Sequence, residues 1–234
     1  YNPRLEFINK NLKVISPKGI LDKIFPSFWR SKNIIKDLRK NKVDLFHGLS
    51  HELPIGIEKT KIKTVVTIHD LIFLRFPNLF TKIDRKIYEK KFRNACENSD
   101  KIIAVSNQTK KDIINFFDVE EKKIEVIYQG CNKVFKSKRK SSEISEVKNK
   151  FNLFENYLLY VGSIEERKNL ITLLHSLKDL QNKNLIIIGD GKNYKEKCIK
   201  YIKNNNLSKR VKILSNLNLH EISCIYQKAD IMIY

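Results

Sequence analysis

Short apolar runs recur along the chain and alternate with stretches of helical spacing. Eight runs predict β-strands: Leu45–Phe46, Thr64–Ile68, Lys101–Val105, Ile124–Tyr128, Tyr157–Val161, Leu185–Ile188, Val211–Leu214 and Ile231–Tyr234. Between them, apolar residues return at i, i+3, i+4 and i+7, a spacing typical of an amphipathic helix; one example is Leu170, Leu173, Leu174 and Leu177. Strands that alternate with helices predict an α/β fold whose parallel sheets are covered on both faces.

A charged, Ser-rich segment separates the first four strands from the last four. It reads FKSKRKSSEISEVKNKFNLFEN, residues 135–156, and it has no strand pattern, so we interpret it as an interdomain connection. The prediction is two Rossmann-like domains: residues 1–138, a linker at 139–155, and residues 156–234. The chain opens without Met and stops in the apolar run ADIMIY. We therefore expect both domains to be incomplete, the first at its start and the second at its end.

Composition limits the class of protein. Hydrophobic residues make up 41% of the 234 residues, enough for packed cores. The longest apolar runs have only a handful of residues, whereas a membrane-spanning helix needs about 20. The chain shows no signal-peptide pattern. Four cysteines without a C-x-x-C pair suit a reducing compartment and lack metal-site spacing. We expect a cytoplasmic protein.

The formal net charge is +20, and most of it lies in the first part of the chain. Residues 1–140 hold 31 Lys and Arg against 16 Asp and Glu. One interpretation is attraction to an anionic partner, such as nucleic acid or an acidic membrane surface. The other is a compositional bias whose lysines solvate ordinary helix faces. The scatter of the lysines favours the second, while the basic first half points to docking at the inner face of the membrane.

The segment YLLYVGSIEERKNLITLLHSL, residues 157–177, carries the most chemical information. A strand ends at Val161, Gly162 turns the chain, and a short loop brings Arg167 and Lys168 to a helix start. Ligands of doubly wound sheets bind outside the carboxyl ends of the strands, and a helix N-terminus suits phosphate. Arg and Lys together can hold a diphosphate. On spacing alone, two further surface cations would explain the pair as well.

This segment, G-S-I-E-E-R-K-N followed by a helix and a strand ending I-I-G-D-G, resembles family 4 of the retaining glycosyltransferases, which have the GT-B fold. The resemblance implies that Arg167 and Lys168 hold the diphosphate of a nucleotide-sugar donor and that Gly162 allows its close approach. Cations placed there would favour the transition state, because the leaving diphosphate gains charge. G-D-G is not G-x-G-x-x-G, which argues against a dinucleotide enzyme.

The resemblance extends along nearly the whole chain. T-I-H-D-L with R-F-P at 75–77 implies that His69 lines the catalytic cleft near the transferred sugar. A neutral imidazole there can hydrogen-bond a sugar hydroxyl; the alternative is a histidine that only ends a strand. Asn216 falls in a stretch that borders the nucleotide base in the family. Gly130 stands at the turn of a segment similar to N-G-V-D-x-x-x-F, with Cys131-Asn132 in place of Val-Asp.

Three other polar residues follow predicted strands. Ser106 in I-I-A-V-S-N-Q-T could face the cleft, but helix capping by Ser106 or Thr109 explains it equally well. His47 and His51 could border the acceptor site, and we favour the interpretation that both are polar loop residues.

The implied function is transfer of a hexose, with mannose and glucose as candidates, from a nucleotide-diphosphate sugar to a saccharide or lipid-linked acceptor of the cell envelope. Cleft closure would exclude water. We expect no metal or other cofactor and no nucleic-acid partner. The family's E-G-F-G-like glutamate segment and its opening glycine-rich loop are absent, so residues 1–234 alone should transfer little or no sugar; measurable turnover would contradict this. The alternatives are a basic protein binding nucleic acid or an anionic surface, which lacks a recognisable reading motif, and a degenerate GT-B remnant.

Overall fold

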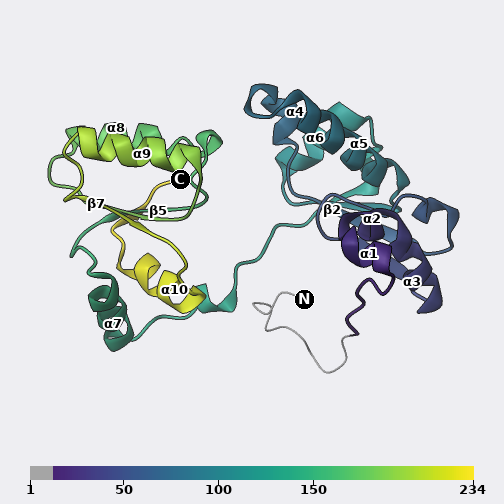
Figure 1. Cartoon of the computed structure of the whole chain (residues 1–234), viewed down its shortest axis with the longest axis horizontal. Helices are drawn as coiled ribbons and strands as arrows, with labels where there is room; N and C mark the ends of the chain where they lie inside the picture. The colour runs from purple at the N-terminus through teal and green to yellow at the C-terminus, as the bar shows by residue number, and fades with distance from the viewer. Residues whose placement is uncertain (1–12) are drawn as a thin grey trace. The chain divides into compact units, whose positions relative to one another are not determined.

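The computed structural model describes residues 13–234, which divide into two compact units; the first ends at Gln129 and the second begins at Gly130 (Figure 1). Each unit contains one four-stranded sheet in which every strand pair is parallel. The eight predicted strands and the parallel α/β class are therefore confirmed. The first twelve residues of the predicted first domain lie outside the described residues.

The first unit has the strand order β1-β2-β3-β4. Its strands are β1 (Leu45–Gly48), β2 (Lys63–Ile68), β3 (Lys101–Ala104) and β4 (Ile124–Val126). Its helices are α1 (Ile20–Ile24), α2 (Pro26–Phe28), α3 (Ile34–Lys40), α4 (Ile72–Arg75), α5 (Lys82–Asn98) and α6 (Asn107–Phe117), with a π-helical turn, η1, at Trp29–Asn33. Figure 1 shows α4, α5 and α6 on one side of the sheet and α1, α2 and α3 on the other.

Alternation along β2 builds the core of the first unit. Val66 and Ile68 are fully buried among residues of α5, α6 and β3, because alternate residues of a strand point to the same face. An ion pair holds α4 on α6: Arg75 Nε donates to both carboxylate oxygens of the buried Asp112, at 3.0 and 3.1 Å. The R-F-P segment therefore has a structural partner in this unit.

The second unit has the strand order β7-β6-β5-β8. Its elements are α7 (Ser141–Phe151), β5 (Leu158–Val161), α8 (Leu170–Asp179), β6 (Leu185–Ile188), α9 (Asn193–Asn204), β7 (Val211–Leu214), α10 (Leu219–Lys228) and β8 (Ile231–Met232). Helices α8 and α9 cover one face, and α7 and α10 cover the other (Figure 1). Strand β6 is buried along its whole length, as expected of a strand covered on both faces.

The predicted linker at 139–155 differs from what the structure shows. Most of it is α7, which packs on α10 through Ile144, Val147 and Phe151. These residues stand at i, i+3 and i+7, a stripe that charged neighbours conceal in the sequence. Glu143 accepts a hydrogen bond from the backbone N–H of Lys140 at 2.7 Å and lies 2.7 Å from His220 Nε2 on α10. The segment thus belongs to the second unit.

Two further findings concern the whole described chain. No helix between residues 13 and 234 is long and apolar enough to cross a bilayer. Cys96, Cys198 and Cys224 are buried and Cys131 is exposed, and all four are free thiols. Burial raises the pKa of Cys96 to about 12, which keeps this thiol protonated and unreactive.

Two glycines of the second unit are required by close backbone approach. A Cβ on Gly189 would lie 1.9 Å from the carbonyl oxygen of Gly162, and one on Gly191 would lie 2.2 Å from that of Ile164. A Cβ on Gly162 would meet nothing closer than 3.6 Å. We predict that Gly189→Ala lowers the free energy of unfolding by about 1–3 kcal/mol, since the backbone must shift. Gly162→Ala is the matched control in urea denaturation, and equal stability of the two variants would contradict the prediction.

Candidate functional site

The carboxyl edge of the first sheet gathers residues from three loops. After β1, His51 turns back with φ 61°, and its backbone N–H donates to the carbonyl of Thr67 at 3.0 Å. After β2, the carbonyl of His69 accepts the Thr109 hydroxyl at 3.0 Å. After β3, Ser106 Oγ accepts the backbone N–H of Thr109 at 3.0 Å and caps α6. Of the two predicted caps, Ser106 is the one observed and Thr109 lies inside α6; the edge brings His51, His69 and Ser106 together.

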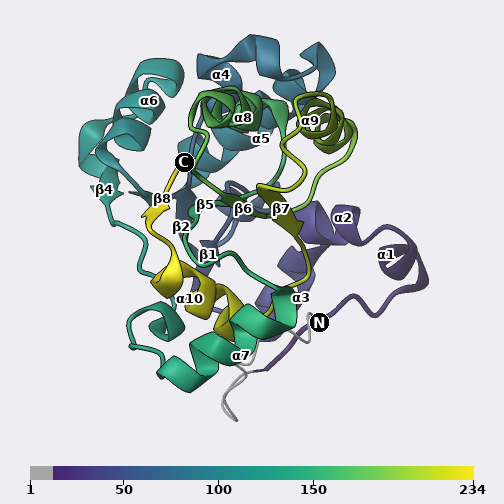
Figure 2. The ribbon, with the colours of Figure 1, turned by 90° about the vertical axis from the view of Figure 1, so that its left-hand side faces the viewer.

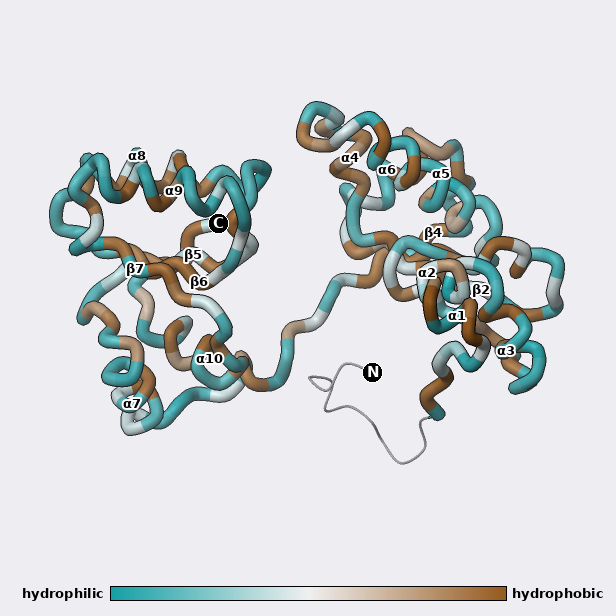
Figure 3. The backbone as a smooth tube through the Cα atoms, in the orientation of Figure 1, coloured by the Kyte–Doolittle hydropathy of each residue, from teal (hydrophilic) through white to brown (hydrophobic). Residues whose placement is uncertain are grey.

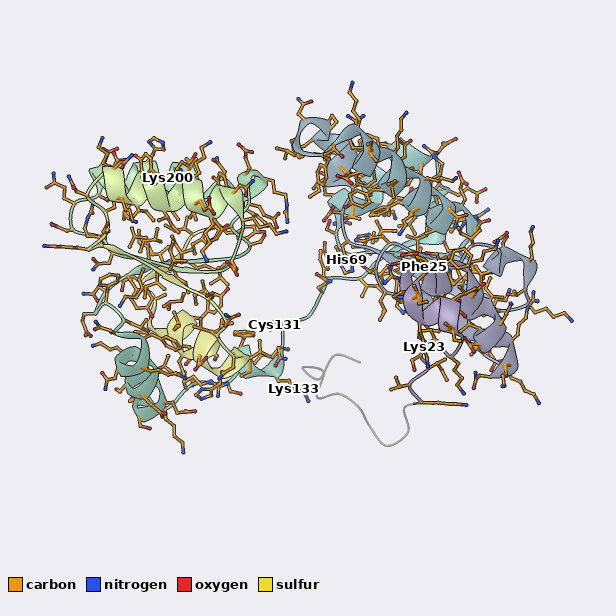
Figure 4. All side chains as sticks on the ribbon, viewed as in Figure 1. Lys23, Phe25, His69, Cys131, Lys133 and Lys200 are labelled. Atoms are coloured by element: carbon orange, nitrogen blue, oxygen red, sulfur yellow. The ribbon has the colours of Figure 1, made fainter. Side chains whose placement is uncertain are left out.

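Both ring nitrogens of His69, a residue that Figure 4 labels, have hydrogen-bond partners. Its Nε2 lies 3.0 Å from the carbonyl oxygen of Leu49, and its Nδ1 lies 3.0 Å from the side-chain nitrogen of Gln129. A carbonyl oxygen only accepts, so Nε2 carries the proton and Nδ1 accepts from the Gln129 amide. The arrangement fits a neutral imidazole. A sugar hydroxyl that reached Nδ1 would take the place of Gln129.

His51 contacts His69 through its ring and through a hydrogen bond to the His69 backbone. Its ring stacks on Phe92, with centroids 4.4 Å apart and planes at 11°, and meets the His69 ring edge-on at 4.9 Å. Its Nδ1 accepts the backbone N–H of His69 at 3.3 Å. Burial, followed by the nearby His69, lowers the pKa of His51 to about 4, against a smaller opposing effect of Asp70. His51 therefore stays neutral near pH 7 and fixes the strand end that carries His69.

A pocket of about 350 Å³ opens beside the end of β1. Its lining includes Arg30, His47, Leu49 and Glu52. His47 Nε2 lies 2.8 Å from the Thr67 hydroxyl. Since Leu49 both lines this pocket and bonds His69, the pocket and His69 share one loop of the first unit.

In the second unit, the loop after β5 carries the predicted cations. They lie in a 3-10 turn, η6 (Glu166–Lys168), and not at the start of α8 as the sequence predicts. Asn169, with φ 50°, separates this turn from the helix. The backbone N–H of Ile171, one of the first in α8, donates to the Tyr194 hydroxyl at 3.0 Å. One helix N-terminal donor expected to face an anion is thus already satisfied within the protein.

Each cation has a local partner. Arg167 Nε donates to Glu165 Oε2 at 2.8 Å. Lys168 Nζ lies 4.1 Å from the ring centroid of Tyr234, beyond the end of β8, a distance at which a cation is attracted to an aromatic face. The side chains of the pair are therefore positioned by the loop after β5 and by the strand end beside it.

The strands of the second sheet change their order next to β5. The chain runs outward through β5, β6 and β7, then crosses back through α10 to place β8 on the other side of β5. The order thus reverses between β5 and β8, and ligands of open parallel α/β sheets generally bind outside the carboxyl edge at such a reversal. The loop carrying Arg167 and Lys168 leaves β5 at this point.

The remaining predicted residues are less closely grouped. Gly162 lies at the same edge, and neither crowding nor a positive φ requires glycine there. Asn216 follows β7, and β6 lies between β7 and β5. The Asn216 side chain is exposed, and the positive φ of 60° at this position explains why the residue is Asn. Gly130 is the first residue of the second unit, and an added Cβ would meet no atom within 4 Å.

Three residues that contact the candidate sites were not predicted from the sequence: Gln129, Tyr194 and Tyr234. Gln129 stands directly before Gly130, where the similar motif has Asn before Gly, and that position was the available signal. Tyr194 and Tyr234 gave no signal, because one lies in α9 and the other ends an apolar run. In residues 13–234, no group of three or more His, Cys, Asp or Glu side chains is placed to hold a metal ion.

Comparisons with known proteins cover both units. The model of "Glycosyltransferase Family 4" matches residues 3–133, and that of "Glycosyl transferases group 1" matches residues 141–234. The O-antigen chain mannosyltransferase RfbU of Salmonella typhimurium is 25% identical over 210 residues, which are 89% of this chain and 53% of that protein. O-antigen chain mannosyltransferase B of Escherichia coli is 28% identical over 140 residues, 59% of this chain and 35% of that one. The chain spans about half the length, or less, of these curated relatives.

Solved structures agree on the fold. HepE of Anabaena, crystallised with UDP-glucose, superposes with a TM-score of 0.71 at 17% identity, covering 94% of this chain and 59% of that one. Sucrose-phosphate synthase of Thermosynechococcus elongatus gives 0.70 at 17% identity, covering 94% and 56%. These likenesses confirm the predicted GT-B fold with two Rossmann-like domains.

We predict that His51 makes the stability of the chain depend on pH. Between pH 6.5 and 4 the unfolded chain binds a proton at His51 that the folded chain does not. Stability is therefore lost as the pH falls through this range, by at most about 1.4 kcal/mol per pH unit.

Urea denaturation at pH 7 and at pH 4.5 measures the effect. Asn tolerates a positive φ and its amide oxygen can accept the His69 N–H, so His51→Asn should lose less stability than wild type on acidification. Identical pH dependence in both proteins would show that His51 does not titrate in this way.

Proposed function

Because the chain belongs to glycosyltransferase family 4, we propose that it acts in the transfer of a hexose from a nucleotide-diphosphate sugar to a saccharide or lipid-linked acceptor, with retention of anomeric configuration. The relatives named as O-antigen chain mannosyltransferases favour mannose as the hexose and a cell-envelope polysaccharide as the product. The second unit would bind the donor, and the first unit would bind the acceptor.

The observation that carries the proposal is the placement of Arg167 and Lys168 at the reversal of strand order in the second sheet. A diphosphate at this edge of the sheet would compete with Glu165 for the Arg167 guanidinium, which can bind two phosphate oxygens at once. Lys168 would add a second, compact positive charge. As the glycosidic bond breaks, the departing diphosphate gains charge, so these fixed cations stabilise the transition state more than the ground state.

Gly162 supports the same location. Neither backbone strain nor packing in this unit requires a glycine at this position. Space left at the end of β5 would let the donor approach the main chain closely. Asn216, two strands away from β5, would contact the more distant nucleotide base.

His69 would bind a hydroxyl group of the sugar. Its neutral ring, with the proton on Nε2, leaves Nδ1 as an acceptor once the Gln129 amide moves aside. A hexose hydroxyl could then donate to Nδ1, which orients the sugar without adding a charge. The expectation that residues 1–234 alone transfer little or no sugar stays a prediction.

We predict that Arg167→Ala and Lys168→Ala each weaken donor binding by about 10- to 100-fold, since a hydrogen bond to a charged group contributes about 1.5–3 kcal/mol. Isothermal titration with UDP-, GDP- and ADP-linked hexoses measures the dissociation constants. Lys209→Ala is the matched control, because Lys209 is exposed and lies just before β7, at the amino edge of the same sheet.

The same titration separates the alternatives. Unchanged binding of the preferred donor by both variants would refute the diphosphate site. Equal binding of all three nucleotides together with a steep loss on added salt would indicate unspecific anion binding. Gly162→Ala should fold normally and still bind more weakly; normal binding would remove the argument from close approach.

We further propose that donor binding needs no metal ion, because the two cations supply the positive charge. Treatment with EDTA should leave the donor dissociation constant within about twofold of its untreated value, and added Mg²⁺ should not restore binding to Arg167→Ala. A tenfold or larger loss on chelation, reversed by Mg²⁺ or Mn²⁺, would overturn this part of the proposal.

A further inference from the structure

The segment of α1 and α2 exposes an unusual number of large apolar side chains. Five of the nine residues from 20 to 28 are large apolar residues that are more than half exposed: Ile20 79%, Leu21 73%, Ile24 62%, Phe25 60% and Phe28 54%. No residue of α1, α2 or η1 is buried. Figure 2 shows α1 and α2 projecting at the margin of the first unit, and Figure 3 shows the apolar character along both helices. We call these five residues the apolar patch.

The apolar patch lies in a strongly basic part of the chain. Residues 13–40 hold eight Lys and Arg and two Asp, a net charge of +6 over 28 residues against +20 over all 234. Lys18 and Lys23 flank the patch residues directly and are exposed (Figure 4 labels Lys23 and Phe25). Both acids are engaged: Asp22 accepts from the Asn33 amide at 2.7 Å, and Asp37 accepts from Trp29 Nε1 at 2.9 Å.

From this surface we infer that the α1–α2 segment docks on an anionic lipid bilayer. Exposed Ile, Leu and Phe side chains beside lysines are typical of segments that lie in the membrane interface, with the apolar side in the acyl boundary and the cations among the headgroups. Duplex nucleic acid offers charge but no apolar depth, so it would leave all five patch residues in water. A second copy of the chain would bring the same positive charge against itself.

The apolar patch adjoins the candidate acceptor side of the first unit. Arg30, two residues beyond Phe28, lines the pocket of about 350 Å³ together with Leu49, whose carbonyl accepts from His69. Docking would hold that pocket close to the lipid surface and so favour a lipid-linked acceptor. This last step rests on the proposed function, whereas docking itself does not.

Vesicle co-sedimentation of the whole chain tests the inference. Wild type should bind vesicles of phosphatidylglycerol and phosphatidylcholine at least tenfold more strongly than vesicles of phosphatidylcholine alone. Ile20→Ser with Phe25→Ser should bind the anionic vesicles at least tenfold more weakly. Lys18→Glu with Lys23→Glu should do the same and abolish the preference for anionic lipid.

Matched controls keep the result specific. Ile83→Ser removes a side chain in α5 that is 72% exposed, and Lys200→Glu reverses an exposed charge on α9 (Figure 4); both should bind vesicles as wild type does. Circular dichroism should show unchanged folding in every variant, because the substituted side chains are exposed. An equal loss of binding in the controls would overturn the inference.

Three other outcomes would also overturn it. One is no binding of wild type to anionic vesicles at low salt. Another is a dimer, seen by light scattering, that Ile20→Ser with Phe25→Ser dissociates. The third is a duplex that binds more tightly than the vesicles and is lost only in the lysine variant. If vesicles bind as expected but donor titration fails, docking stands and only the proposed transfer reaction is refuted.

Discussion

Parallel pairing of the strands is the constraint on which both candidate sites depend. In each unit, all strands end at the same edge of the sheet, so the loops that follow them lie side by side whatever their separation in the chain. The opposite edge serves stability. There, Asp100 accepts the backbone N–H and the hydroxyl of Thr64, at 2.7 and 3.0 Å, and the backbone hydrogen bond is the largest cause of its lowered pKa. This contact fixes the start of β2 to the start of β3, whereas the candidate site residues lie at the carboxyl edge.

The two units use their carboxyl edges in different ways. In the first, the strands follow one another in sequence order, and the site is a set of polar groups that fix one another: His51 holds His69, and Leu49 and Gln129 hold its ring. In the second, the strand order reverses beside β5, and the loop that carries the two candidate cations leaves the sheet at this point. The proposed function assigns the sugar to the first set of groups and the diphosphate to the two cations.

The sequence predicts best what depends on local pattern. Every strand appeared as a short apolar run, including β8, whose two residues are exposed. Arg167, Lys168 and Gly162 could be assigned to the end of β5, since a strand, a turn and a helix follow within twenty residues. The linker could not be judged in this way: the partners that attach α7 to the second unit, such as His220 for Glu143, lie far along the chain. The partners of His69 likewise come from 20 and 60 residues away.

The positions of several Lys and Arg side chains explain part of the high positive charge of the chain. Several cations donate to the carbonyls that end helices, where no backbone partner remains. They are Arg93 at the end of α6, Lys123 at α5, Arg210 at α8 and Lys212 at α7. A cation near a helix C-terminus is also favoured by the helix dipole.

Such cations are held by carbonyls spread over four helices and both units, so they do not form the continuous basic stripe that a duplex requires. Net charge therefore says little about the partner of this chain. Position separates the helix-capping cations from two other groups. Arg167 and Lys168 stand where the order of a sheet reverses, and Lys18 and Lys23 stand beside exposed apolar side chains. The proposed function places a diphosphate at the first group, and the proposed docking places a lipid headgroup layer at the second.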